Sequence, residues 1–142
     1  MTITPAQITL PIIQGATFRE PLKRAVFPYL VREECGRLVK ADSGMPAPDS
    51  DRVPEDYTGC KARVQMRRDI NSPVIHELTT ENDGILLSGD TLTLALTPVQ
   101  TSAFVYGSTP PAWKSCMGHV EVERPNGDVE RQYEITFPLS PE

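Results

Sequence analysis

The chain has 142 residues, the usual size of one domain and enough to bury a core without a disulfide or a metal ion. Its net charge of -5 argues against a protein that grips nucleic acid, since that task needs a basic surface. Its 14 prolines leave few windows for helices, because proline inside a helix removes a hydrogen bond and clashes with the preceding turn. Composition therefore favours a single domain of strands joined by proline-marked turns.

No apolar run approaches the roughly 20 residues that a membrane-spanning helix needs, and the start of the chain lacks the features of a signal peptide. We therefore expect no membrane association and a chain that stays in a cytoplasm. The three cysteines, Cys35, Cys60 and Cys116, are an odd number at wide spacing, so we expect buried, reduced thiols that pack as small apolar groups. With two histidines and no Cys-x-x-Cys pair, we expect neither a zinc site nor any other cofactor.

The first strands are predicted at Ala6 to Ile13 and at Thr17 to Leu22, on either side of a break at Gln14-Gly15. Apolar side chains are concentrated at this end of the chain. They are Ile3, Ile8, Leu10, Ile12 and Ile13. Two interpretations are open: the segment is the first strand of this domain, or it docks on or swaps with a neighbouring subunit and these side chains bind the partner.

The next block, Val26 to Val39, is interpreted as an extension of the sheet, with Pro28 at an edge or a bend. Residues 40–56 are rich in Pro, Asp, Ser and Gly, which predicts an exposed loop. The loop carries five carboxylates, and these could hold calcium. They are Asp42, Asp49, Asp51, Glu55 and Asp56. A solvated loop is the simpler interpretation, because prolines interrupt the alternate ligand spacing of an EF-hand.

Two stretches in the middle of the chain, Cys60 to Arg67 and Thr91 to Leu96, alternate apolar and polar residues with the period of a half-buried strand. Val74 to Leu78 is interpreted as another short strand, followed by a turn at Glu81 to Gly84. A basic strip of Lys61, Arg63, Arg67 and Arg68 could meet an acidic partner or phosphates. The simpler interpretation is that these side chains form the solvent-exposed face of a half-buried strand.

One short helix is predicted from Thr97 to Phe104, with Thr97 as its cap and Pro98 at its first position, as a crossover between two sheets. An irregular loop, Gly107 to Ala112, then leads to Trp113. Trp113 could be a platform for a ligand or partner, although a core or rim position is the commoner place for a single tryptophan.

The end of the chain predicts a hairpin of Cys116 to Glu123 and Val129 to Phe137 around the turn Arg124 to Asp128. We expect Val129, with alternate residues after it, to face the core, interrupted by Arg131. Pro138 and Pro141 are expected to end the pairing, because neither can donate to a ladder.

No catalytic motif is present, and the candidates have simpler interpretations. His76 and His119 could form an acid-base pair with Glu121 if their strands were neighbours. Histidines on the surface of a sheet are far commoner, so we expect no enzyme and no catalytic residue.

Three passages, residues 8–21, 56–104 and 118–142, resemble in their order and spacing a family of small tailed-phage virion proteins. The likeness is to the immunoglobulin-like N-terminal domain of upper baseplate subunits in siphophages. The passages read ITLPIIQGATFREP, then a strand core from DYTGCKARVQ to a Thr-Glu-Asn turn, and the closing hairpin GHVEVERPNGDVERQYEITFPLSPE. Residues 23 to 55 depart from the family pattern, which has a short strand and a tight turn there.

The resemblance implies an immunoglobulin-like antiparallel β-sandwich without enzymatic activity or cofactor. It also implies a virion structural protein of the tail or baseplate, the collar or the head surface, assembled in the host cytoplasm. Its expected partners are other virion proteins and copies of itself. The alternative is a module on the particle that binds a host receptor or glycan, with an aromatic site near Trp113, Tyr106 or Tyr29.

Overall fold

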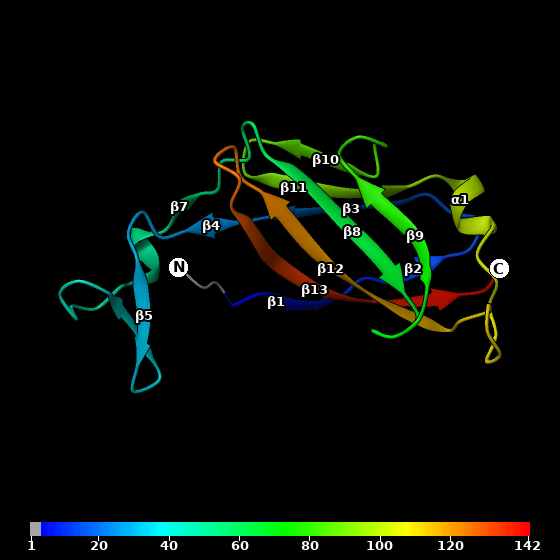
Figure 1. The fold of residues 1–142 in the computed structure, drawn as a ribbon, viewed down its shortest axis with the longest axis horizontal. Coiled ribbons are helices and arrows are strands. Elements are labelled where there is room, and N and C mark those ends of the chain that lie inside the picture. Colours follow the sequence, from blue (N-terminus) through cyan, green and yellow to red (C-terminus); the bar gives the residue numbers. More distant parts are fainter. Residues whose placement is uncertain (1–3) are drawn as a thin grey trace.

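The structure, a computed structural model, describes residues 4–142. It consists mainly of strands with one short α-helix (Figure 1), so the prediction of an all-β fold with one short helical crossover is confirmed. The strands are β1 (Ala6–Thr9), β2 (Ile12–Ile13), β3 (Phe18–Lys23), β4 (Ala25–Val26), β5 (Val31–Glu34), β6 (Arg37–Lys40), β7 (Val53–Pro54), β8 (Lys61–Arg67), β9 (Val74–Thr79), β10 (Ile85–Ser88), β11 (Thr91–Leu96), β12 (Ser115–Glu123) and β13 (Val129–Ser140). The helices are α1 (Pro98–Ser102) and a single 3-10 turn (Asp49–Asp51).

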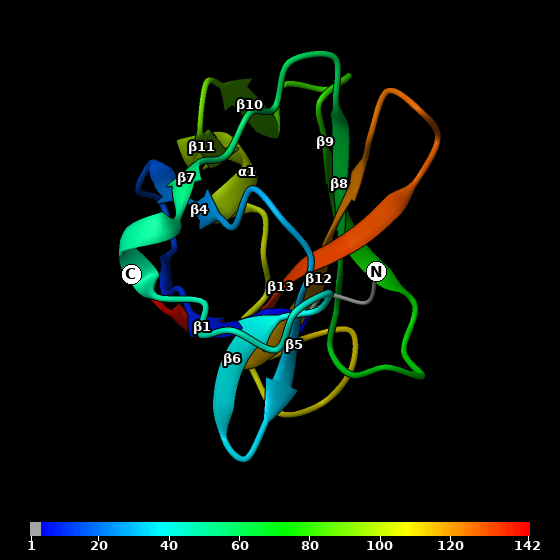
Figure 2. The ribbon, with the colours of Figure 1, turned by 90° about the vertical axis from the view of Figure 1, so that its left-hand side faces the viewer.

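Two sheets face each other in a sandwich-like arrangement (Figure 2). The larger sheet has the order β1-β13-β12-β8-β9, and β2 pairs with the end of β13. The smaller sheet has the order β10-β11-β3. Phe18 of the smaller sheet meets Phe137 of the larger one edge to face, with ring centroids 6.1 Å apart. The core lies between the sheets, because both contribute fully buried side chains to one cluster.

The alternating stretches of the sequence form strands as predicted. In β8 the side chains of Ala62, Val64 and Met66 are buried while Lys61 and Arg63 are exposed. In β11 all three leucines are buried. Apolar side chains on one face of each strand therefore supply the two inner surfaces of the sandwich.

Strand β13 contains a bulge that the alternation of the sequence does not reveal. Strand β12 pairs successive residues with Tyr133 and Arg131, so Gln132 is an extra residue in the ladder. The bulge reverses the alternation before it, and both Arg131 and Val129 are exposed. The prediction that Val129 faces the core is wrong for this reason, and the charge of Arg131 reaches water.

Strand β13 also continues through Pro138 to Ser140, so the prediction that Pro138 ends the pairing is wrong. The carbonyls of Thr136 and Ser140 accept hydrogen bonds from the backbone N–H groups of Leu10 and Gln14. Backbone polar groups of alternate residues face the same side of a strand, so the nitrogen of Pro138 faces this side too. The partner on that side is interrupted between β1 and β2. The missing N–H of proline therefore costs no ladder hydrogen bond.

The N-terminal segment pairs with its own domain. Strand β1 runs parallel to β13, with Ile8 opposite Ile135. Ile8 and Leu10 pack against the core, and Ile12 is fully buried in it. Within the described residues, the segment is thus the first strand of this domain, which is one of the two interpretations above.

The helix forms as predicted. The Thr97 hydroxyl accepts from the backbone N–H of Gln100, and the Gln100 side chain accepts from the backbone N–H of Thr97. Pro98 occupies the first position, where its missing N–H is not needed. Within residues 4–142, no helix is long and apolar enough to span a membrane.

Residues 27–52 form a hairpin lobe that projects from one end of the sandwich (Figure 1, left). Strands β4 and β7 pair at its base, and β5 pairs with β6 across a tight turn. Cys35 and Gly36 have φ of 52° and 76° in that turn, as a two-residue hairpin connection of type I′ requires. Cys35 is exposed at this turn, so the expectation of a buried thiol is wrong there, whereas Cys116 is buried. The expectation that Val26 to Val39 extends the sheet is wrong, because β5 and β6 pair with each other.

The segment of residues 40–56 is mostly exposed, but it is not a simple loop. Strand β6 reaches into it, Ala47 is buried, and Glu55 is only 6% exposed. Glu55 accepts hydrogen bonds from Arg24 at 2.7 Å and from Arg124 at 2.8 Å. Arg124 also donates to Glu130 at 2.9 Å. This ionic network around the buried Glu55 carboxylate joins the base of the lobe to the β12–β13 hairpin, so Glu55 is a structural residue and not a solvated one.

Candidate functional site

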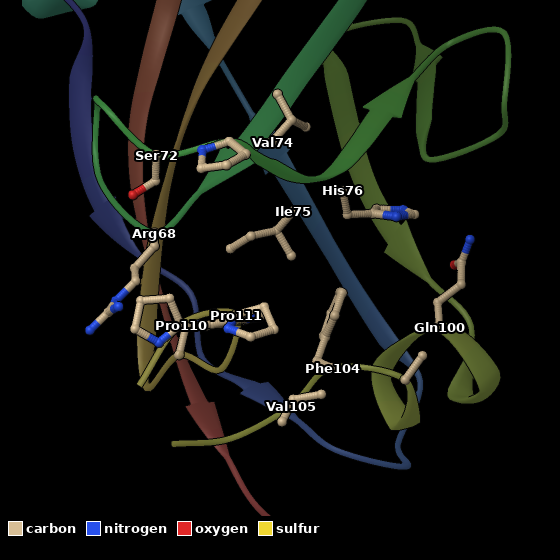
Figure 3. Close-up of a pocket in the computed structure, with 13 residues that line it drawn as sticks. Arg68, Ser72, Val74, Ile75, His76, Gln100, Phe104, Val105, Pro110 and Pro111 are labelled. Carbon is tan, nitrogen blue, oxygen red and sulfur yellow. The ribbon is translucent and has the colours of Figure 1, made fainter. Parts of the chain in front are cut away.

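A pocket of about 710 Å³ opens between strand β9, helix α1 and the segment that follows the helix (Figure 3). Its lining consists of Arg68, Ser72, Pro73, Val74, Ile75, His76, Gln100, Ala103, Phe104, Val105, Pro110, Pro111 and Trp113. Most of these side chains are apolar, which is typical of a surface that binds another apolar group.

The aromatic side of the pocket is built by the return of the chain after α1. The rings of Phe104 and Trp113 lie 5.3 Å apart, and Trp113 is only 1% exposed. The backbone N–H of Trp113 donates to the carbonyl of Val105 at 2.9 Å, which holds the two ends of the intervening loop together. The loop is thereby fixed as a wall, with its two prolines beside the pocket.

The polar chemistry of the pocket is sparse. Among the 13 lining residues, Arg68 is the only one with a formal charge at neutral pH, and it donates to the carbonyl of Ser108 at 2.8 Å. The Nε2 atom of His76 is buried and has no hydrogen-bond partner. Burial lowers the pKa of His76, and the charge of Glu77 opposes this shift without cancelling it, so the imidazole is neutral at neutral pH.

Apolar side chains surround the opening. Val74 and Val105 line the pocket and are 40% and 57% exposed. Val99 and Tyr106, which neighbour lining residues in the chain, are exposed as well. Exposed apolar groups gathered around a concave surface are characteristic of an interaction site.

The pocket also borders an open edge of the larger sheet. Strand β9 ends that sheet, and β8 is its only neighbour among the strands of residues 4–142. At its far end Asn82 covers the edge: its side chain accepts from the N–H of Thr79 at 2.9 Å and donates to the carbonyl of Glu77 at 2.8 Å. The stretch from Val74 to His76, beside the pocket, has no such side-chain cover. Met66 pairs with His76 and Arg67 with Val74, so Ile75 is an extra residue and the edge is bulged there.

The structure scatters the side chains that the sequence singled out for partner binding. Trp113 lies under the pocket in the core, so its ring is not an exposed platform. Ile12 is fully buried, while Ile13 is exposed at the edge of the larger sheet. Ile3 lies outside the described residues.

The two histidines do not meet. His76 is in β9 and His119 in β12, with β8 between these strands. His119 lies 3.8 Å from Glu134, whereas His76 packs its ring edge against Phe104. Within residues 4–142, no group of three or more His, Cys, Asp or Glu side chains is placed to hold a metal ion.

Sequence reasoning missed most of the pocket. The sequence places Phe104 at the end of a crossover and Pro110-Pro111 in an irregular loop, and it predicts no role for Val105. The available signal was the pair of prolines following an apolar stretch, since prolines stiffen a loop and hold it open to a ligand. The opposite wall comes from β9, about thirty residues earlier in the chain, and no local pattern brings the two together.

Comparison of the chain with models of known protein families finds no match, and comparison with curated proteins finds no matching relative.

Proposed function

We propose that the chain is a non-enzymatic structural subunit of a tailed-phage virion, located in the tail or baseplate, the collar or the head surface. It assembles through subunit contacts, and the pocket beside β9 is the main contact surface. Its partners are other virion proteins and copies of itself.

The observation that carries the proposal is the apolar pocket next to an uncovered sheet edge. An uncovered strand offers backbone hydrogen bonds, and a neighbouring apolar pocket offers a place for a side chain of the partner. The pocket suits binding better than catalysis, since no carboxylate lines it and the Nε2 atom of its one histidine has no hydrogen-bond partner. The resemblance of three sequence passages to virion proteins supports a location in a phage particle.

The strand order supports an immunoglobulin-like sandwich as part of this proposal. In that fold, sheets of three or four and of four or five antiparallel strands face each other with Greek-key connections. The order β10-β11-β3 opposite β13-β12-β8-β9 agrees with such a pairing. The hairpin lobe, residues 27–52, is an addition to it.

Imaging and mass spectrometry of purified particles that carry this gene test the proposal. We expect the chain in the particle at a copy number that matches a symmetric ring. We also expect the phage variant Val105→Asp, which places a charge on the pocket rim, to lose the subunit from the particle. Val129→Asp is the matched control, because Val129 is equally exposed but distant from the pocket lining. Absence of the chain from purified particles would overturn the proposal.

The second candidate is a module displayed on the particle that binds a host receptor or glycan. Tyr106 favours it, since this ring is 42% exposed next to the pocket and Lys114 lies 5.9 Å above it. Trp113 does not contribute a face, because its ring is buried. Glycan-array binding that disappears in Tyr106→Ala would favour this candidate over the first.

A further inference from the structure

The hairpin lobe displays apolar side chains that it does not bury. Leu30 and Met45 are each 60% exposed, and Leu38 is 38% exposed. The lobe is nevertheless well held together. Phe27 and Tyr29 stack with centroids 5.7 Å apart, and Arg52 lies 4.3 Å above the ring of Phe27. An ordered element that keeps leucine and methionine in water is a candidate for the inserted half of an interface.

The lobe carries five carboxylates and four basic side chains, so its net charge is only −1, but one exposed pair of residues on it complements the pocket. Glu33 is exposed and lies opposite Leu38 in the β5–β6 ladder, so an acidic and an apolar side chain stand together. The pocket combines the reverse charge with apolar walls, because Arg68 is its only formally charged residue. An apolar group with a carboxylate beside it therefore fits an apolar pocket with a guanidinium at its rim.

The lobe lies at one end of the long axis of the molecule, and α1 and β9, whose residues line the pocket, lie toward the other end (Figure 1). One copy cannot bring its own lobe to its own pocket while the sandwich is folded. Each copy nevertheless carries both surfaces, so the lobe of one copy can meet the pocket of the next. A contact between two different surfaces of identical chains continues from copy to copy, and it closes into a ring or extends as a filament.

We propose that the hairpin lobe of one copy inserts into the pocket beside β9 of the next, with Leu38 in the apolar part and Glu33 paired with Arg68. The inference deepens the proposed function and rests on it, since it names the partner of the pocket as a second copy of this chain. Repetition of the contact gives the multiple copies that a virion ring contains.

Two variants, each with one damaged surface, test the contact. Leu38→Lys removes the apolar group from the lobe, and its new cation lies opposite Glu33, where the hairpin tolerates it. Val105→Asp damages the pocket and leaves the lobe intact. Leu86→Lys and Val129→Asp are the matched controls, since both positions are similarly exposed and lie outside the lobe and the pocket.

Analytical ultracentrifugation gives the readout. We expect the wild type and both controls to form concentration-dependent oligomers, and each damaged variant to be a monomer alone. A mixture of the two damaged variants retains one intact lobe and one intact pocket, so we expect a one-to-one heterodimer and nothing larger. A wild type that is monomeric up to its solubility limit, or a mixture without heterodimer, would overturn the inference.

A charge exchange tests the pairing itself. Glu33→Arg and Arg68→Glu each place like charges in contact, so we expect each to lose association, and we expect the double variant to regain it. Because Arg68 also holds the carbonyl of Ser108, near-ultraviolet circular dichroism of Arg68→Glu checks that the pocket wall is intact. A double variant that remains monomeric with an intact wall contradicts the assigned pair.

The failure of this inference and the failure of the proposed function are distinguishable. If the chain is present in particles but stays monomeric in every mixture, the virion role stands and the lobe-to-pocket contact is refuted. If the chain forms the heterodimer in solution but is absent from particles, the contact stands and the virion role is refuted.

Discussion

Gly118 lies in the middle of β12, where the core leaves no room for a side chain. A Cβ atom at this position would lie 2.6 Å from Cγ1 of Val64 and 3.1 Å from the ring of Phe137. Both neighbours are completely buried and have little space to move. The glycine is therefore required by close packing between β12, β8 and β13.

We expect Gly118→Ala to lower the free energy of unfolding by about 1–3 kcal/mol, because the added methyl overpacks the core. Urea unfolding followed by the fluorescence of Trp113 measures the effect. The same substitution in a Val64→Ala background should cost less, since the clashing methyl group is gone. Equal costs in the two backgrounds would show that the contact with Val64 is not the reason.

Glu55 illustrates how a buried charge is tolerated. Burial alone would raise the pKa of this carboxyl, but hydrogen bonds from Arg124 and from the N–H of Asp56, with the charges of Arg124 and Arg24, lower it below its ordinary value. A carboxyl with a lowered pKa in the folded state stabilises the fold above its unfolded pKa, which is about 4.3. That stabilisation is lost as the pH falls through the folded pKa.

We expect Glu55→Gln to cost about 3 kcal/mol at neutral pH, because two arginines lose their buried counter-charge. The variant should also lose less stability than the wild type between neutral pH and about pH 3, since the titrating group is gone. Urea midpoints across that range measure both effects. Glu123→Gln is the control, because Glu123 is exposed and makes none of these contacts. A parallel decline of the wild type and Glu55→Gln with acid would refute the assignment.

At the scale of the elements, Asn82 substitutes for a missing strand at the end of β9. It satisfies the carbonyl of Glu77 and the N–H groups of Thr79 and Gly84, which limits strand addition at this end of the sheet. A partner strand therefore has the Val74 to His76 end of β9 available, next to the pocket.

We expect Asn82→Ala to destabilise the domain by about 1–2 kcal/mol and to accelerate hydrogen exchange at the amide of Thr79, because three backbone groups lose their partner. Hydrogen exchange followed by mass spectrometry measures the local effect. Asn71→Ala, in an exposed loop, should leave this amide unchanged. Unaltered protection of Thr79 in Asn82→Ala would mean that the side chain does not cover the edge.

The sequence predicts those elements whose signal is local. Strands β8 and β11 alternate over at least six residues, and α1 carries its capping box within four residues. The bulge at Gln132 depends on a partner strand, and the pairing of β5 with β6 depends on two residues with positive φ. The candidate pocket forms only when β9 and the loop after α1 come together in the fold. The sequence therefore singled out Trp113 but did not predict the pocket that it lines.

At the scale of the whole molecule, the sandwich and the hairpin lobe are separable. The lobe leaves and re-enters at the paired residues Val26 and Val53, so a two-residue Asn-Gly turn can replace residues 27–52. We expect the shortened chain to fold with a change in unfolding free energy below about 2 kcal/mol, since the entropy cost of closing a loop grows only slowly with the length of the loop. Thermal unfolding tests this, and sedimentation should show that self-association is lost. A chain that fails to fold would show that the lobe supports the sandwich.

Strand β13 pairs with β1, β2 and β12, and it is the last of the described strands to be synthesised while β1 is the first. During translation, β1 therefore has no strand to pair with until almost all of residues 4–142 have been synthesised. A nascent chain that stops before β13 leaves β12 and β1 without a common neighbour. A polypeptide that is truncated before β13 therefore cannot complete the larger sheet.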